Sequence, residues 1–267
     1  MTKAYRYLRR GSPRCIWRSG FGFIIILLFT VILTGPGCAL LGYPFGKQTD
    51  PHAEDIINHI QAFNAQISTS KGTGELILTR GFRKEKYKIA WAAQAPNRLR
   101  MTLLISGHPV ETIASTGQWV TFVSHTGAHK PHSAVSTDPD LDPYINIPLR
   151  LSELVSLLLG KMPERPFDRV WVLPEKPGTV FASQSFSSEI QEWLTNESGR
   201  AIRYRVLDED KNMIFGIWYS QFFKRDNFIL PGVITIKNWE QGVIKISMKN
   251  IMPNIHIKES VFRLTES

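Results

Sequence analysis

The sequence predicts a mainly β fold: a single curved antiparallel sheet of about eleven strands, forming an incomplete (half-open) barrel, with an N-terminal helix and a lid helix enclosing an apolar cavity. Three observations predict it. Apolar and polar residues alternate in many short runs, gaps of hairpin length separate these runs, and only two segments have the 3.6-residue period of a helix. A meander of this size curls until it partly closes, and side chains cannot fill its inside completely beyond about eight strands.

Composition and charge favour one large domain. The chain has 267 residues, of which 43% are hydrophobic, and this is enough for one substantial core. Its formal charge of +9 arises mainly in the first 37 residues, which hold six of the 32 basic side chains and no acidic one. Without them, 26 basic and 23 acidic side chains remain, a net charge of +3. We therefore expect no nucleic-acid partner.

Residues 1–37 are predicted to be a lipoprotein signal peptide. Basic residues precede an uncharged stretch of thirteen residues at 21–33. A helix of that length spans about 20 Å, which is too short for the ~30 Å hydrocarbon core of a bilayer. Gly35 and Gly37 precede Cys38, and this resembles the lipobox cleaved by lipoprotein signal peptidase. Gly35 and Pro36 depart from the usual lipobox residues, so an uncleaved or ordinarily cleaved signal is the alternative.

Lipidation of Cys38 would anchor the protein to a membrane. Several acyl chains hold a protein stably at a bilayer, whereas one chain is marginal. Residues 38–50 would then be the lipidated cysteine and a tether, and residues 51–267 the ligand-binding domain. Ala39 follows the cysteine in place of the aspartate that retains many lipoproteins in the inner membrane. This favours a lipid anchor in the outer membrane, with the domain facing the periplasm.

The first element of the domain is an amphipathic helix that begins at Asp50 and Pro51, an N-cap residue and a first-turn proline. Its apolar positions recur at Ile56, Ile60, Phe63 and Ile67. Five strands are expected next, around residues 76–78, 87–91, 98–103, 110–114 and 119–123.

A loop is expected over residues 125–148, which are rich in His, Pro, Ser and Asp. The helical period then returns, and Gly160 ends the second helix. We expect this helix to be the lid, with one apolar face formed by Leu151, Leu154, Val155, Leu158 and Leu159. Six further strands are expected at residues 169–173, 188–194, 201–207, 214–219, 232–237 and 243–249.

Three stretches resemble the LolB family and its periplasmic relative LolA, which move lipoproteins to the outer membrane. They are NRLRMTLLI at 97–105, INIPLRLSELVSLLLGKM at 145–162 and LPGVITIKNWEQGVIKISMK at 230–249. The resemblance implies an incomplete barrel with helices over its open side and a cavity for the acyl chains of a lipoprotein. It also implies a periplasmic LolA-like carrier as donor. The family's exposed leucine, which helps deliver cargo into the membrane, is missing from the corresponding turn at 106–109.

Large apolar side chains on the expected strands are the candidates for the cavity lining. An ordinary filled core is the alternative interpretation for each of them, because such residues are normally buried. As a set under a helical lid they suit acyl chains, which need only apolar surface removed from water. The predicted cavity residues are Tyr87, Trp91, Met101, Leu103, Trp119, Phe122, Trp171 and Trp218.

Catalytic and metal-binding motifs do not emerge from the sequence. His125, His129 and His132 have the spacing of a helical zinc site, but Gly127 and Pro131 favour a loop. The aspartates at 138, 140 and 142 begin like a calcium loop that the following residues do not complete. The chain has no Gly-x-Ser-x-Gly elbow and no His-Glu-x-x-His helix. We expect no enzyme, no cofactor and no metal.

The sequence therefore predicts a membrane-anchored, monomeric lipoprotein that binds the acyl chains of lipoproteins, or a related amphiphile, in outer-membrane lipoprotein localisation. The alternative is a structural adaptor in an envelope complex, whose cavity is filled by its own side chains. An enzyme acting on a lipid or glycan is a third reading, for which no site can be assembled from the loop histidines and aspartates.

Overall fold

A computed structural model describes residues 50–145, 148–240 and 242–264 of the chain. These residues lie within one compact unit that runs from Phe45 to Ser267. The predicted signal peptide and Cys38 lie outside the described residues. Among the described residues, no helix has the length and apolar character needed to cross a membrane.

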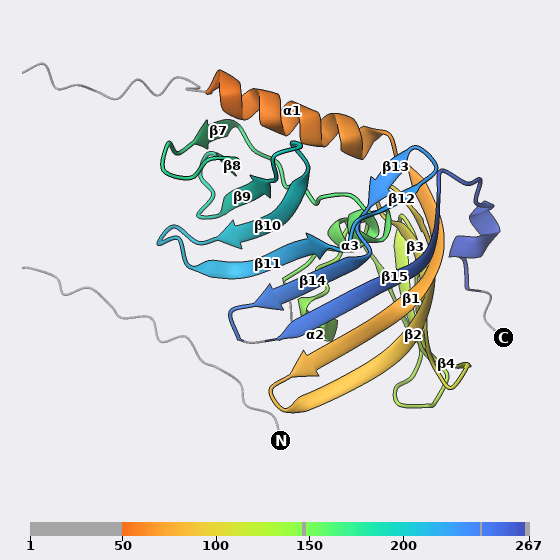
Figure 1. Ribbon diagram of the computed structural model, residues 1–267. Helices are drawn as coiled ribbons and strands as arrows, with labels where there is room; N and C mark the ends of the chain where they lie inside the picture. The colour runs from red at the N-terminus through yellow and green to blue at the C-terminus, as the bar shows by residue number, and fades with distance from the viewer. Residues whose placement is uncertain (1–49, 146–147, 241, 265–267) are drawn as a thin grey trace, which may run out of the picture. The chain divides into compact units, whose positions relative to one another are not determined.

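Helix α1 (Pro51–Ala65) begins as its sequence predicts, because the side chain of Asp50 accepts a hydrogen bond from the backbone N–H of His52 at 2.9 Å. The helix buries Ala53, Ile57 and Ile60 and packs on strands β7 (Arg169–Val172) and β8 (Thr179–Ser183). Figure 1 shows it lying across one end of the sheet.

The sheet is a single antiparallel array of thirteen strands in the order β6-β5-β4-β3-β2-β1-β15-β14-β11-β10-β9-β8-β7. Its first half consists of β1 (Thr69–Arg80), β2 (Arg83–Gln94), β3 (Arg98–Ile105), β4 (His108–Thr116), β5 (Trp119–Ser124) and β6 (His132–Val135). Its second half, besides β7 and β8, consists of β9 (Ile190–Thr195), β10 (Ala201–Leu207), β11 (Met213–Ser220), β14 (Val233–Asn238) and β15 (Val243–Pro253).

Pairing of β1 with β15 joins the two halves, and β6 and β7 form the two edges. The sheet curves but does not close (Figure 1), so the predicted half-open antiparallel barrel is confirmed. The array has two strands more than the eleven predicted, because β6 and β8 lie in segments without a clear period-two pattern. Strands β12 (Phe223–Arg225) and β13 (Phe228–Leu230) form a separate small hairpin.

The curved sheet has an inner face, which carries the main core, and an outer face. Along β2, Tyr87, Ile89, Trp91 and Ala93 belong to the main core, whereas Ala92 belongs to a separate small cluster with the C-terminal tail. The part of this tail that the structure describes, up to residue 264, includes a 3₁₀ turn at Glu259–Phe262, lies on the outer face of β3 and β4, and adds no strand to the sheet. Apolar burial on the inner face therefore stabilises the curvature.

Two short helices follow β6. Helix α2 (Asp142–Ile145) lies in the segment expected to be a loop, and helix α3 (Leu151–Leu158) is the predicted lid helix. Asp138 caps the start of α3, since its carboxylate accepts hydrogen bonds from the backbone N–H and the hydroxyl of Ser152 at 2.8 and 2.9 Å. Gly160 follows the helix with φ +76°, the left-handed conformation in which glycine ends a helix.

Candidate functional site

An apolar cavity of about 400 Å³ lies on the inner face of the sheet. Six strands, the segment that links β5 to α3, and α3 itself form its walls. A volume of this size falls within the range of small-molecule binding pockets. The lining residues are Leu76, Leu78, Met101, Leu103, Glu111, Ile113, Phe122, His129, His132, Leu141, Pro143, Tyr144, Leu149, Leu154, Ile236, Ile244 and Ile246.

One ionisable pair interrupts this apolar lining. Nε2 of His129 lies 3.0 Å from Oε1 of Glu111, and Nδ1 of His129 lies 2.9 Å from the backbone oxygen of Lys130. The hydrogen bond to Lys130, followed by the bond to Glu111, raises the pKa of His129 above its ordinary value. The pair therefore ties the segment after β5 to strand β4 beside the cavity.

Aromatic rings form one wall of the cavity. The ring of Tyr144, in α2, stacks on Phe122 with centroids 4.2 Å apart, and His132 stacks on Phe122 at 4.9 Å. Nη2 of Arg80 donates a hydrogen bond to the backbone oxygen of Tyr144 at 3.1 Å. These contacts hold α2 against β5 and the end of β1.

Three predicted cavity residues, Met101, Leu103 and Phe122, line the cavity together. Tyr87 and Trp91 lie on the same inner face but do not line it. Trp91 is buried deeper, where its indole N–H donates to the hydroxyl of Ser70 at 3.0 Å.

The other three predicted cavity residues lie outside the cavity. Strand side chains alternate between faces, and Trp119, Trp171 and Trp218 stand at positions whose strand neighbours face inward. Trp119 is 51% exposed, Trp171 stacks on Phe181 away from the main core, and Trp218 packs over Gly216 with the ammonium of Lys237 above its ring. Size alone singles out these tryptophans in the sequence. The alternation of side chains along each strand places them on the face away from the cavity.

The predicted lid residues are all buried, and the helix lies inside the curve of the sheet. These five residues are Leu151, Leu154, Val155, Leu158 and Leu159. Leu154 also contributes to the cavity wall. The helix also buries Glu153 and Leu157 on its remaining faces. Only Ser152 and Ser156 are half-buried, and a helix with most of its surface buried is a core element. In this structure α3 therefore belongs to the core and contributes one side chain, Leu154, to the cavity wall.

Hydrogen bonds fix α3 and its following residues to the sheet from two sides. The hydroxyl of Ser70, on β1, donates to the backbone oxygen of Leu158 at 2.8 Å. The hydroxyl of Tyr219, on β11, donates to the backbone oxygen of Lys161 at 2.9 Å, and burial raises the pKa of that tyrosine well above its usual range.

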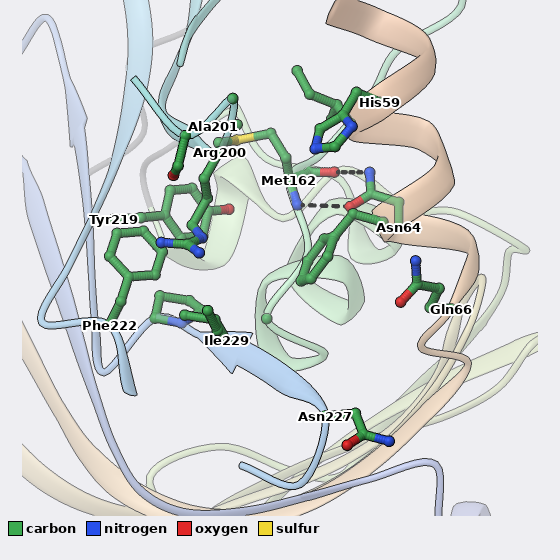
Figure 2. Close-up of a pocket in the computed structure, with 16 residues that line it drawn as sticks. His59, Asn64, Gln66, Met162, Arg200, Ala201, Tyr219, Phe222, Asn227 and Ile229 are labelled. Atoms are coloured by element: carbon green, nitrogen blue, oxygen red, sulfur yellow. Dashed lines mark hydrogen bonds between the residues drawn. The ribbon is translucent and has the colours of Figure 1, made fainter. Parts of the chain in front are cut away.

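A second, smaller cavity of about 230 Å³ lies between α1, the residues after α3, and the β12–β13 hairpin (Figure 2). Asn64 and Met162 exchange two hydrogen bonds at 2.8 and 3.2 Å beside it. The guanidinium of Arg200 lies over the ring of Phe222 at 5.1 Å. No predicted site residue lines this cavity; its walls combine α1 residues such as Ile60 and Phe63 with residues of turns that are distant in the sequence.

The loop histidines and aspartates do not assemble into a metal site. In the described part of the chain, no group of three or more His, Cys, Asp or Glu side chains is arranged to hold a metal. His125 contacts the hydroxyl of Thr112 at 2.9 Å, Asp138 accepts a hydrogen bond from the backbone N–H of Ser152 in α3, and Asp140 accepts one from the backbone N–H of Asp142. These side chains thus have structural partners.

No protein-family model and no curated protein sequence matches the chain. Several solved structures are similar to it in fold. A domain assigned to outer-membrane lipoprotein sorting from Vibrio parahaemolyticus is 11% identical, with a TM-score of 0.52 over 79% of this chain and 97% of that one. A LolA superfamily protein from Nitrosomonas europaea is 8% identical, with a TM-score of 0.50 over 79% and 97%.

A DUF1329 family protein from Desulfovibrio piger is 9% identical, with a TM-score of 0.53 over 80% of this chain and 98% of that one. Identities this low establish the architecture and leave the activity to be argued from the site. The half-open sheet, the helix inside its curve and these similarities together show that the chain has the LolA/LolB-like fold of lipoprotein-sorting domains.

Proposed function

We propose that this protein binds acyl chains, those of lipoproteins or of a related amphiphile, in the apolar cavity between β1, β3–β5, β14, β15 and α3. The cavity lining carries the proposal. It is aliphatic or aromatic apart from Glu111, His129, His132 and the hydroxyl of Tyr144. An apolar ligand needs no catalytic group, and each buried CH₂ contributes about 0.8 kcal/mol.

The fold supports the same function. The Vibrio domain is assigned to outer-membrane lipoprotein sorting, and the Nitrosomonas protein to the LolA superfamily. By analogy, this chain would receive lipoproteins from a periplasmic LolA-like carrier. Transfer requires that this cavity binds the acyl chains more tightly than the donor does, because a ligand moves only toward higher affinity.

Membrane anchoring belongs to the proposal as well. Acylation of Cys38 at the outer membrane would hold the domain in the periplasm, where cargo is handed over. The sequence of the leader and the lipobox-like residues before Cys38 support this part.

Binding of acylated and unacylated cargo tests the function. Residues 39–267, produced without the leader, would be mixed with a triacylated lipoprotein or with its unacylated form. We expect stoichiometric binding of the acylated form alone. Equal binding of both forms, or none, would contradict the carrier function. Met101→Ala should weaken binding, since Met101 lines the cavity, whereas Trp119→Ala should not.

A structural adaptor is the second candidate, and one observation favours it. Much of the hollow inside the sheet is filled by α3, where Leu151, Val155, Leu157 and Leu158 have no exposed surface. An adaptor with a self-filled core would bind a protein partner irrespective of acylation.

A further inference from the structure

Three neighbouring hairpin turns at one end of the sheet expose large apolar side chains. Phe82, between β1 and β2, is fully exposed; Ile105, the last residue of β3 before its turn to β4, is 50% exposed; and Trp239, between β14 and β15, is 71% exposed. The strand order β4-β3-β2-β1-β15-β14 makes these turns adjacent. We call Phe82, Ile105 and Trp239 the apolar rim.

The β1–β2 hairpin extends furthest (Figure 1). Pairing of β1 with β15 ends at Thr79 and Val243, and pairing of β2 with β3 ends at Lys88 and Leu104. Residues 80–84 therefore protrude beyond both neighbouring strands, with Phe82 at the tip. Exposed apolar side chains that gather on one surface and are rimmed by polar residues mark interaction or membrane-binding sites.

Cations surround the protruding phenylalanine. Residues 80–88 contain five of them, all exposed, and a single acidic residue, Glu85, which pairs with Arg83 at 2.7 Å. The Trp239 turn adds one more acid, Glu240. The five cations are Arg80, Arg83, Lys84, Lys86 and Lys88. An apolar tip flanked by basic residues matches the interface of an anionic bilayer, where the ring enters the headgroup region and the cations meet phosphates.

The basic and apolar surface ends at the next turn along the sheet, which is acidic. The β10–β11 turn carries Asp208, Glu209 and Asp210, which an anionic surface would repel.

The apolar cavity lies at the same end. Leu78, two residues before Arg80, lines it together with Tyr144. These two residues also line an adjoining crevice of about 240 Å³ that contains Arg80, Arg83 and Glu85. The cavity and the crevice beside the protruding hairpin thus share the side chains of Leu78 and Tyr144.

We propose that the apolar rim, together with the basic residues of the β1–β2 hairpin, docks the domain on an anionic phospholipid surface. Docking brings the cavity end of the sheet to the bilayer. Docking does not depend on an occupied cavity, so experiments can test it independently of acyl-chain binding.

Vesicle binding of the compact unit, residues 45–267, tests the proposal. This unit contains the complete sheet and its own core, and circular dichroism would confirm its folding. We expect it to sediment with vesicles of phosphatidylglycerol and phosphatidylcholine, and much less with phosphatidylcholine alone. Binding should fall as salt rises, because screening weakens attraction between exposed charges.

Two matched pairs of variants locate the docking surface. Phe82→Ser should weaken binding by about tenfold. Trp119→Ser should leave binding unchanged, because this exposed aromatic residue is the first of β5 and lies at the end of the sheet away from the apolar rim. Arg83→Gln with Lys84→Gln should weaken binding by about fivefold per cation, whereas the exposed Lys224→Gln with Lys258→Gln should not.

Tryptophan fluorescence gives an independent readout. Vesicles should shift the emission to shorter wavelength, and Trp239→Phe should remove that shift. Equal binding to neutral and anionic vesicles, no binding to either, or equal effects of Phe82→Ser and Trp119→Ser would overturn the proposal. Acyl-chain binding without vesicles should be the same in Phe82→Ser as in the unchanged protein, which separates the two functions.

Discussion

The carboxylate of Glu153, on α3, accepts a hydrogen bond from Nε of Arg165 at 2.8 Å and joins the helix to the segment that follows it. The Glu153 side chain is only 3% exposed. Burial alone would lower the pKa of Arg165, but the hydrogen bonds and charge of Glu153 outweigh it and raise that pKa. Arg165 also donates to Glu189 at 2.7 Å and to the backbone oxygen of Pro148 at 3.0 Å. The guanidinium is thus fully engaged around the start of α3.

Removing the buried carboxylate should be strongly destabilising. Glu153→Ala leaves the charge of Arg165 uncompensated in a buried site, and we expect the free energy of unfolding to fall by about 3 kcal/mol. Glu189→Ala is the control, because that side chain is 39% exposed and its loss should cost about 1 kcal/mol or less. Urea denaturation measures both. Equal losses would contradict the central role of the Glu153–Arg165 pair.

Helix α3 should open only when the whole domain unfolds. Six of its eight residues are buried, Ser152 and Ser156 are half-buried, and hydrogen bonds from Ser70 and Tyr219 hold its C-terminal end. We therefore expect the backbone N–H groups of Leu157 and Leu159 to exchange with a protection free energy within about 1 kcal/mol of global unfolding. Native-state hydrogen exchange tests this. Much faster exchange at α3 than in β1 would instead support a mobile lid.

The pairing of His129 with Glu111 should depend on pH. The backbone oxygen of Lys130 and the carboxylate of Glu111 raise the pKa of His129 in the folded protein above the value of ~6.5 in an unfolded chain. The stabilisation is therefore complete below pH ~6.5 and is lost as pH rises through the raised pKa. An NMR titration of the imidazole should show this, and Glu111→Gln should lower the pKa. An unchanged titration in the variant would contradict the pairing.

Gly72 should be intolerant of any side chain. A Cβ at this position would overlap the ring of Trp91 and would lie 2.5 Å from the backbone oxygen of Asn250. Gly72→Ala would therefore displace Trp91 from Ser70, and we expect a loss of about 2 kcal/mol in the free energy of unfolding. The exposed neighbour Thr73→Ala should cost less than about 0.5 kcal/mol. A neutral Gly72→Ala in thermal or urea unfolding would contradict this packing.

Local patterns in the sequence predict most of the sheet, because period-two alternation directly records which face of a strand is buried. They miss β6, in which all four residues His132–Val135 are exposed, so no apolar alternation marks the strand. They miss β8, which follows Pro177 and Gly178 and is too short for the pattern to develop. Pairing with a neighbouring strand stabilises both, and sequence periodicity does not record that pairing.

The cavity was predicted less well than the sheet. Met101 and Leu103 differ by two positions and therefore share a face, but Trp119 and Phe122 differ by three and cannot both face inward. The wall formed by Leu141, Pro143, Tyr144 and Leu149 comes from the segment expected to be a loop. Its position depends on tertiary contacts, such as the stacking of Tyr144 on Phe122, that have no local signature.

Filling the cavity tests its role most directly. Leu78 and Ile77 are adjacent, similarly half-buried aliphatic residues of β1, but Leu78 lines the cavity and Ile77 does not. Binding of a triacylated lipoprotein would be measured for Leu78→Trp and Ile77→Trp, each first confirmed to be folded. The account predicts that Leu78→Trp abolishes binding by occupying the space of the acyl chains, while Ile77→Trp binds normally. Undiminished binding by a folded Leu78→Trp protein would contradict the account.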